Sequence, residues 1–213
     1  MKTLTSLLAA AALATGSGIG HAQEAVTPGF YLGAGGGWSN VKWDEAVIAG
    51  QLTSLGYAAG SVTSDREGTA WRVFGGYRAN QWLAVEAGYT DYGSTGWTAT
   101  ITRPAGTLAS AGDLTTWEVD ALLIWPIMGV EPYLRVGVGY ASLDTSVSAT
   151  GAARAAGGVS ENSTRLRYGA GAQMHFGAFG VRAEWTRTDG VGSTATGGEM
   201  NADTTLISLM WRF

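Results

Sequence analysis

The sequence predicts an all-β fold, an eight-stranded antiparallel up-and-down transmembrane β-barrel. Two observations support this prediction. Eight segments alternate apolar residues with polar residues or glycines, which is the period of two expected for strands. The links between them alternate between short turns and long Gly/Ala/Ser/Thr-rich segments, as in membrane barrels with short periplasmic turns and four long extracellular loops.

The first 22 residues are expected to be a cleaved signal peptide. Residues 1–3 provide a short positive start, and residues 4–13 are nearly all apolar. Gly20 and Ala22 place small residues three and one positions before a cleavage point. The barrel domain is then expected to comprise residues 23–213. A buried N-terminal helix is the alternative for this segment.

Beyond that segment, no run is long enough for a spanning helix. The longest apolar run, from Ala121 to Val130, is interrupted by Pro126 and Gly129. A spanning helix needs about 18 apolar residues. The mean hydropathy of +0.07 agrees with alternating strands, whose two faces average to a neutral value.

The strands and links follow from this alternation along the chain. Strands are expected at residues 30–38, 71–77, 83–90, 117–125, 134–140, 165–176, 181–186 and 205–213. Short turns are expected at residues 78–81, 126–131 and 177–180, and long loops at residues 40–68, 92–114, 142–162 and 188–203.

The charged residues within strands fall on the glycine-bearing face, while the other face is apolar. A soluble barrel would have the opposite arrangement, and a soluble lipocalin-like barrel is the alternative fold. Because hydrocarbon requires apolar side chains outside, the apolar face is expected to contact lipid. Its aromatic residues are expected to form two girdles at the lipid–water boundaries: Phe30, Trp38, Trp71, Tyr77, Tyr89, Trp117, Trp125, Tyr140, Trp185 and Trp211.

The charged face predicts an ion-pair network in the lumen. An eight-stranded barrel has room inside only for its own side chains, and an unpaired buried ion costs several kcal/mol. The expected members are Arg72, Glu86, Glu118, Asp120, Arg135, Arg165, Arg167, Arg182 and Glu184. The alternative use of these charges is a narrow, gated conduit. Glu118 and Asp120 would also suit acid–base chemistry or a cation, although pairing with Arg135 is favoured.

Several segments resemble the transmembrane domain of outer membrane protein A, a member of the small outer-membrane β-barrel superfamily. The similar segments are Phe74–Asn80, Val85–Tyr89, Tyr133-x-Arg135-x-Gly137, Arg182–Trp185 and Trp211–Phe213. The resemblance implies an integral protein of the bacterial outer membrane. It also implies that Trp211 and Phe213 belong to a sorting signal that the outer-membrane assembly machinery reads.

The chain also departs from that family. In the relatives, acid–base pairs block the lumen; Glu86 and Arg182 match two of these positions, whereas Leu122 and Gln173 stand at the other two. A gating exchange among those four positions is therefore in doubt. The chain stops at the eighth strand, so no peptidoglycan-binding domain is expected.

Composition excludes other classes of function. There is no cysteine, so neither a disulfide nor a thiolate site is expected, and a net charge of −4 argues against nucleic acid as a partner. His175 has no neighbouring triad partner, and a lipid A deacylase would need a histidine near Ser208. We therefore expect no enzyme, no metal and no cofactor.

The leading functional hypothesis is a structural and surface-interaction protein that acts in envelope integrity, adhesion or host contact through its loops. The alternative is a small porin-like pore for ions or small solutes, and a lipid-modifying enzyme is a third possibility. The expected partners are outer-membrane lipids (lipopolysaccharide or phospholipid), the assembly machinery and an unidentified ligand of the extracellular loops.

Overall fold

The computed structural model describes residues 28–127, 129–153, 158–192 and 200–213. The predicted signal peptide, residues 1–22, lies outside these ranges. The described residues form nine strands and one helix. The elements are β1 (Gly29–Lys42), α1 (Glu45–Ser54), β2 (Ala58–Asp65), β3 (Glu67–Arg78), β4 (Leu83–Arg103), β5 (Ala105–Ile124), β6 (Val130–Gly151), β7 (Val159–Phe176), β8 (Phe179–Val191) and β9 (Met200–Arg212).

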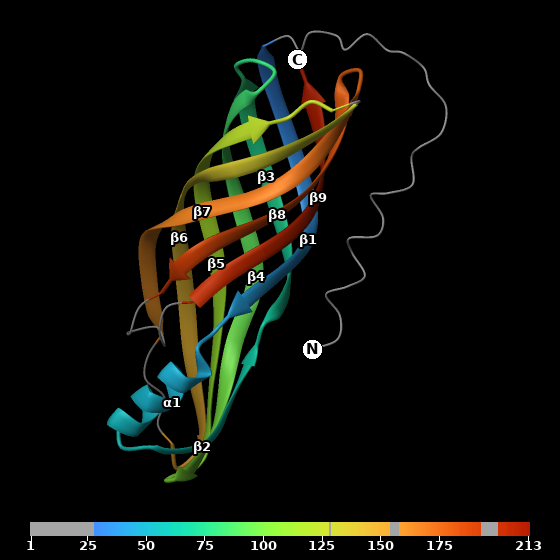
Figure 1. The fold of residues 1–213 in the computed structure, drawn as a ribbon. Helices are drawn as coiled ribbons and strands as arrows, with labels where there is room; N and C mark the ends of the chain where they lie inside the picture. The colour runs from blue at the N-terminus through green and yellow to red at the C-terminus, as the bar shows by residue number, and fades with distance from the viewer. Residues whose placement is uncertain (1–27, 128, 154–157, 193–199) are drawn as a thin grey trace.

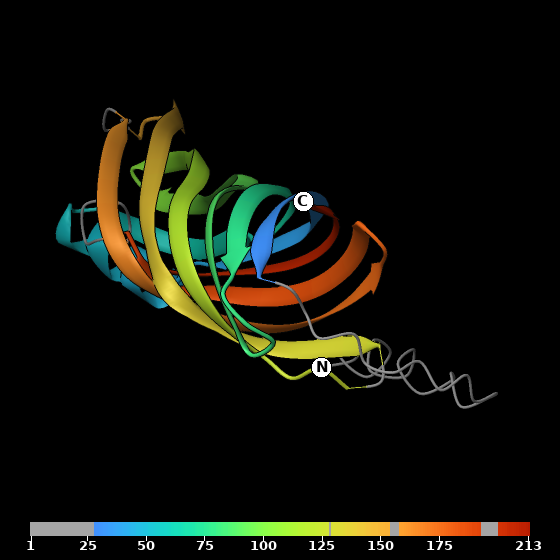
Figure 2. The same cartoon turned by 90° about the horizontal axis from the view of Figure 1, so that it is seen from above.

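Eight of the nine strands close into a ring. Every pairing is antiparallel, β1 lies between β3 and β9, and pairing of β4 with β5 closes the sheet on itself. The strands curve around a common interior when the molecule is seen from the end that carries the short turns (Figure 2). The predicted antiparallel up-and-down barrel is therefore confirmed.

The ninth strand corrects the predicted number of eight. β2 lies in the first predicted loop and pairs with the outer half of β4, from Gly96 to Arg103, on the edge of the sheet. Its sequence, AAGSVTSD, consists of small and polar residues and one valine. That composition resembles a loop, and only the pairing with β4 makes it a strand.

Two more of the predicted loops are largely strand. β4 and β5 form a hairpin that continues to Arg103 and Ala105, and β6 continues to Gly151. These three strands have 21, 20 and 22 residues, whereas about 9–11 residues cross a membrane. They project well beyond the other strands at the end that carries α1 (Figure 1). We call residues 92–103, 105–115 and 142–151, together with α1 and β2, the extension.

The helix α1 was not predicted, although its local signals are present. The carboxylate of Asp44 caps it by accepting hydrogen bonds from the backbone N–H groups of Ala46 and Val47, at 3.0 and 3.2 Å. Ile48 and Leu52, four residues apart, form its buried side. Within the described ranges, no helix is both long and apolar enough to cross a membrane.

The interior is filled in layers along the barrel axis. An apolar cluster near the short turns contains Tyr31, Phe74, Leu122, Tyr133 and Met210. Charged side chains form the next layer, towards the loop end of the barrel. A larger apolar cluster fills the extension and includes the buried side of α1.

Candidate functional site

Four arginines and four carboxylates meet at the middle of the lumen. They come from six consecutive strands of the ring, β3 to β8, and each residue is at most 3 % exposed. Their formal charges cancel. We call these residues the ionic layer: Arg72, Glu86, Glu118, Asp120, Arg135, Arg167, Arg182 and Glu184.

Arg72 and Arg135 are the central cations of the layer. Arg72 pairs with Glu118, with Glu184 at 3.0 Å and with Glu86 at 3.1 Å. Arg135 shares two of these partners, because it lies 2.7 Å from Glu184 and 3.1 Å from Glu86. Glu86 and Glu184 thus each accept from both guanidinium groups, which ties opposite walls of the barrel together.

Arg182 and Arg167 border the layer on its two sides. Arg182 pairs with Glu86 and donates to the side-chain oxygen of Gln173 at 2.8 Å. Arg167 lies 2.6 Å from Glu118 and donates to the hydroxyl of Tyr92 at 3.0 Å. Both cations therefore join the carboxylates to neutral polar groups.

Aromatic residues close the layer on the side of the short turns. The hydroxyl of Tyr31 donates to Glu86 at 2.8 Å, and that of Tyr133 donates to Glu184 at 2.7 Å. The guanidinium of Arg182 lies 4.7 Å from the ring centre of Phe74. This dense set of donors suits buried carboxylates, which are costly to leave unpaired.

The close approach of two strands in this layer depends on Gly137. A Cβ atom at this position would collide with the Asp120 carboxylate and with the Val119 carbonyl. The absence of a side chain leaves the lumenal space to Asp120, whose partner is Arg135 on the next strand.

One residue predicted for the network is placed differently. Arg165 lies two residues nearer the loops than Arg167 on β7, and its Nη2 donates to the backbone carbonyl of Gly192 at 3.0 Å. The strand alternation gave the correct face of the barrel but not the height along its axis. The other eight predicted residues come together in the ionic layer.

A second polar cluster near the short turns was not predicted. Glu131 lies 2.6 Å from Arg78, accepts from Gln173 at 2.7 Å and lies 3.4 Å from His175. Arg78 also donates to the carbonyl of Gln81 at 2.8 Å. Both Arg78 and Glu131 had been assigned to short turns, so their inward orientation was missed. A cavity of about 10 Å³ between this cluster and Arg182 is about the size of one water molecule.

The loop end of the lumen is closed by the extension. Ile48 and Leu52 of α1 pack into its apolar cluster, and the indole N–H of Trp43 donates to the Thr95 hydroxyl at 2.9 Å. At the surface, Glu45 accepts from the Ser64 hydroxyl at 2.8 Å and lies 2.7 Å from Arg66. These hydrogen bonds from Ser64 and Arg66 hold the pKa of the Glu45 carboxyl below its usual value.

The residues predicted for the aromatic girdles lie on the outer wall. The rings of Trp71, Tyr89 and Trp117 form a row across three strands, with centres 5.4 and 5.0 Å apart. Towards the short turns, the rings of Phe30 and Tyr77 lie 4.9 Å apart. The remaining predicted members are also exposed on this wall: Trp38, Trp125, Tyr140, Trp185 and Trp211.

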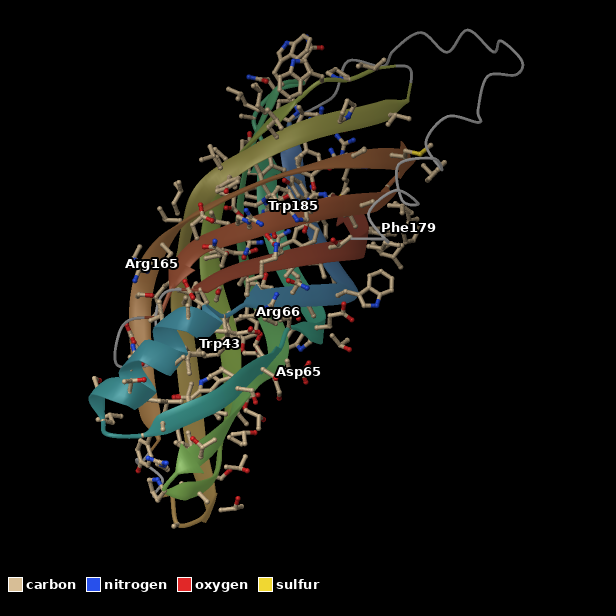
Figure 3. All side chains as sticks on the ribbon, turned by 60° about the horizontal axis from the view of Figure 1, so that its bottom comes forward. Trp43, Asp65, Arg66, Arg165, Phe179 and Trp185 are labelled. Carbon is tan, nitrogen blue, oxygen red and sulfur yellow. The ribbon has the colours of Figure 1, made fainter. Side chains whose placement is uncertain are left out.

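Further outward aromatic residues were not among the predicted girdle residues. Trp82 and Phe176 are 44 and 62 % exposed, and the ring of Phe179 packs against Trp211 at 4.4 Å. Phe179 and Trp185, both labelled in Figure 3, belong to β8, and Phe179 lies nearer the short turns. Trp82 and Phe179 stand in or beside predicted turns, where alternation gives no orientation. Phe176 ends the predicted strand of residues 165–176 and faces outward, as its alternation indicates.

Two solved structures resemble this fold. The chain is similar to Neisserial surface protein A, with 16 % identity, a TM-score of 0.54 and coverage of 88 % of this chain and all of that chain. It is also similar to Ail, the attachment invasion locus protein of Yersinia pestis, solved in complex with the heparin analogue sucrose octasulfate. In that case the identity is 17 %, the TM-score 0.51, and the coverage 88 % of this chain and all of that chain. No curated protein sequence matches this chain significantly.

The sequence matches a family model as well. The model, described as outer membrane protein beta-barrel domain, matches residues 5–213. The match agrees with the closed ring, the apolar outer wall and the charged interior. The chain therefore belongs to the outer membrane protein beta-barrel domain family, and it is a protein of the bacterial outer membrane.

Proposed function

We propose that this protein is a closed barrel that acts through its extracellular surface, with a structural or surface-interaction role in the envelope. The observation that carries this proposal is the filled lumen. Its charged groups are fully buried, mutually paired and formally neutral as a set. Such a layer supports a plug that fixes the barrel's shape, and the proposed role involves no catalysis.

The extension supports the second half of the proposal. Its strands continue the barrel outside the membrane, and its interior is an apolar core like that of a soluble protein. Outward positions on it, such as Ser146 and Ser148, are polar and exposed. A rigid, well-packed surface of this kind suits adhesion or host contact better than a flexible loop does, because less ordering entropy is lost on binding.

Two partners follow from the wall and the last strand. Outer-membrane lipids cover the apolar outer wall. We further propose that the assembly machinery reads the end of β9 and the residue after it, since Trp211 and Phe213 are 42 and 76 % exposed. Both side chains face outward rather than into the lumen.

One observation favours a pore as the second candidate. Among the described residues, the Asp120 Oδ1 atom and the Arg135 Nε atom are buried without a hydrogen-bond partner. Incompletely bonded ions can exchange partners more readily than saturated ones. Such an exchange would be the starting point of a gated conduit.

Single-channel conductance of the chain without residues 1–22, refolded into a planar bilayer, distinguishes the two candidates. We expect no reproducible conductance steps, and none for Glu86→Gln or Arg182→Gln. Arg66→Gln, which removes a surface charge, is the matched control. Stable charge-selective steps that grow in the lumenal variants but not in the control would establish the pore and contradict the plug.

A further inference from the structure

A group of polar and aromatic side chains lies on the outer wall at the level where the apolar surface ends. Arg187 on β8 pairs in register with Asp203 on β9 and with Tyr168 on β7. Trp185, two residues before Arg187, therefore faces the same way and is 38 % exposed. Lys42 ends β1, four residues beyond the exposed Trp38.

Asp203 holds two cations in this group. The Arg187 guanidinium donates to both carboxylate oxygens, at 2.7 and 2.8 Å, and the Lys42 Nζ atom lies 3.2 Å from Oδ2. The carboxylate is largely covered, at 11 % side-chain exposure, whereas Arg187 and Lys42 keep 27 and 50 %. We call Arg187 and Lys42 the outer cation pair. With Asp203 it carries a net charge of +1 and still presents unused N–H donors.

The position of the outer cation pair along the membrane normal follows from its neighbours on the side of the short turns. On β9, Ile207 and Leu209 face outward and are 57 and 68 % exposed, as lipid-facing residues are. The guanidinium of Arg187 lies 5.6 Å from the ring centre of Trp185. Tryptophan at the end of an apolar wall marks the headgroup boundary, so the outer cation pair lies at the height of lipid phosphates.

A polar recess lies directly beside Lys42. It has a volume of about 420 Å³, and its lining includes Lys42, Asp44, Glu45, Arg66 and Asn201. Lys42 is shared between the recess and the outer cation pair. Arg66, labelled in Figure 3, lies near the loop end of β1 and close to the labelled Trp43. Carboxylates, an amide and a guanidinium around one hollow are the groups that recognise sugar hydroxyls through hydrogen bonds.

We propose that this part of the wall binds the headgroup of a phosphorylated glycolipid of the outer leaflet. Arg187 and Lys42 take the phosphate through charge-assisted hydrogen bonds, and the recess takes a sugar ring. The acyl chains follow the apolar wall of β8, β9 and β1. This inference rests on the outer-membrane location and deepens the proposed structural role by naming one lipid class and its site.

The test is native mass spectrometry of the protein released from phosphatidylcholine nanodiscs that contain bisphosphorylated lipid A. We expect one retained glycolipid per barrel. Arg187→Gln and Lys42→Gln should each reduce retention about tenfold or more, the effect of losing a charge-assisted hydrogen bond. Arg103→Gln, at the tip of the β4–β5 hairpin, removes the same charge at a distance and should have no effect. Far-UV circular dichroism verifies that each variant is folded.

Two further lipids test the chemistry of the headgroup. Dephosphorylated lipid A should not be retained; equal retention would overturn the phosphate contact. Phosphatidylglycerol or free phosphate that competes as well as lipid A would overturn the sugar recess. Equal loss in the Arg103→Gln control would reduce the site to general electrostatics and overturn it. Conductance is independent of this readout, so an open lumen with intact lipid retention would contradict the plug alone.

Discussion

The membrane wall and the extension are built from the same strands but are filled in opposite ways. On the wall part of β5, the outward Trp117 and Val119 are 66 and 52 % exposed, and the inward Glu118 is 3 % exposed. In the extension, the outward residue is the polar Asp113, and the inward residue is Leu114, which is fully buried. β5 and β6 pair without a register shift through this change.

The difference shows that the surrounding solvent selects the side chains, while the backbone pattern stays the same. In hydrocarbon, apolar groups belong outside and charges must find partners inside. In water, burial of the apolar side stabilises the fold, and the outside is polar. Trp117, which pairs with Tyr140 on β6, marks the row at which the two arrangements meet.

The largest expected effect comes from removing a cation of the ionic layer. Arg72→Gln removes one of the two arginine partners of Glu118 and one of the two of Glu184, and breaking a buried ion pair costs about 3–5 kcal/mol. Equilibrium urea unfolding in lipid vesicles measures this loss. Arg103→Gln, an exposed arginine of the extension, should change stability by less than about 0.5 kcal/mol. Equal losses in both variants would mean that the layer is not needed for the barrel.

The next prediction compares the cost of an outward-facing arginine at two positions of β5, one in the wall and one in the extension. Val119→Arg places a cation in hydrocarbon and should destabilise the barrel by about 2–4 kcal/mol. Ala111→Arg makes the same change eight residues along the outward face of β5, in the extension, where we expect less than about 0.5 kcal/mol. The same urea titration measures both variants. Similar costs at the two positions would place the extension in the membrane.

A smaller effect is expected in the core of the extension. Ile48→Val removes one buried methylene group from the contact of α1 and should cost about 0.5–1.5 kcal/mol. Hydrogen exchange of the α1 amides is the measurement, because only the extension should loosen. Val47→Ala, on the exposed side of the same helix, is the control. Unchanged exchange in Ile48→Val would show that α1 is not docked on the core.

The smallest effect concerns pH at the surface of the extension. The pKa of Glu45 is lowered in the folded state by Ser64 and Arg66, so its contribution is present above the usual carboxyl pKa of 4.5. It is lost as the pH falls through the lowered folded-state pKa. The rate at which an acid-stable protease cleaves the α1–β2 segment should therefore increase as the pH is lowered from 5 to 3. Glu45→Gln should lack this pH dependence, and a wild-type response identical to that variant would contradict the contact.

The wall could be predicted from the sequence because lipid imposes a strict alternation. Leu134, Val136 and Val138 had to face outward, and the charged residues of the same strands had to face inward. Alternation defines only the face, however. It did not show that Arg165 lies nearer the loops than the ionic layer, nor that Arg78 and Glu131 at strand ends point into the lumen.

The extension was harder to predict because its strands contain many small residues. Gly, Ala, Ser and Thr are common in loops, and in β2 they form a strand only through pairing with β4. The helix carried better signals. Asp44 stands at the N-cap position, Glu45 follows in the first turn, and Ile48 and Leu52 have the spacing of one helical face. That pattern would have been sufficient to predict α1, but residues 40–68 were assigned to a loop as a whole.

The reversal between wall and extension is tested most directly by a cysteine scan along the outward face of β5. The chain has no native cysteine, so single spin labels can be placed at positions 109, 111, 113, 115, 117, 119 and 121 in turn. Electron paramagnetic resonance in bilayers compares collision with oxygen, which enters lipid, and with a water-soluble nickel chelate. We expect oxygen to dominate from position 117 to 121 and the nickel chelate to dominate from 115 to 109. Oxygen-dominated collision continuing to position 109 would contradict the boundary at Trp117 and place the extension in lipid.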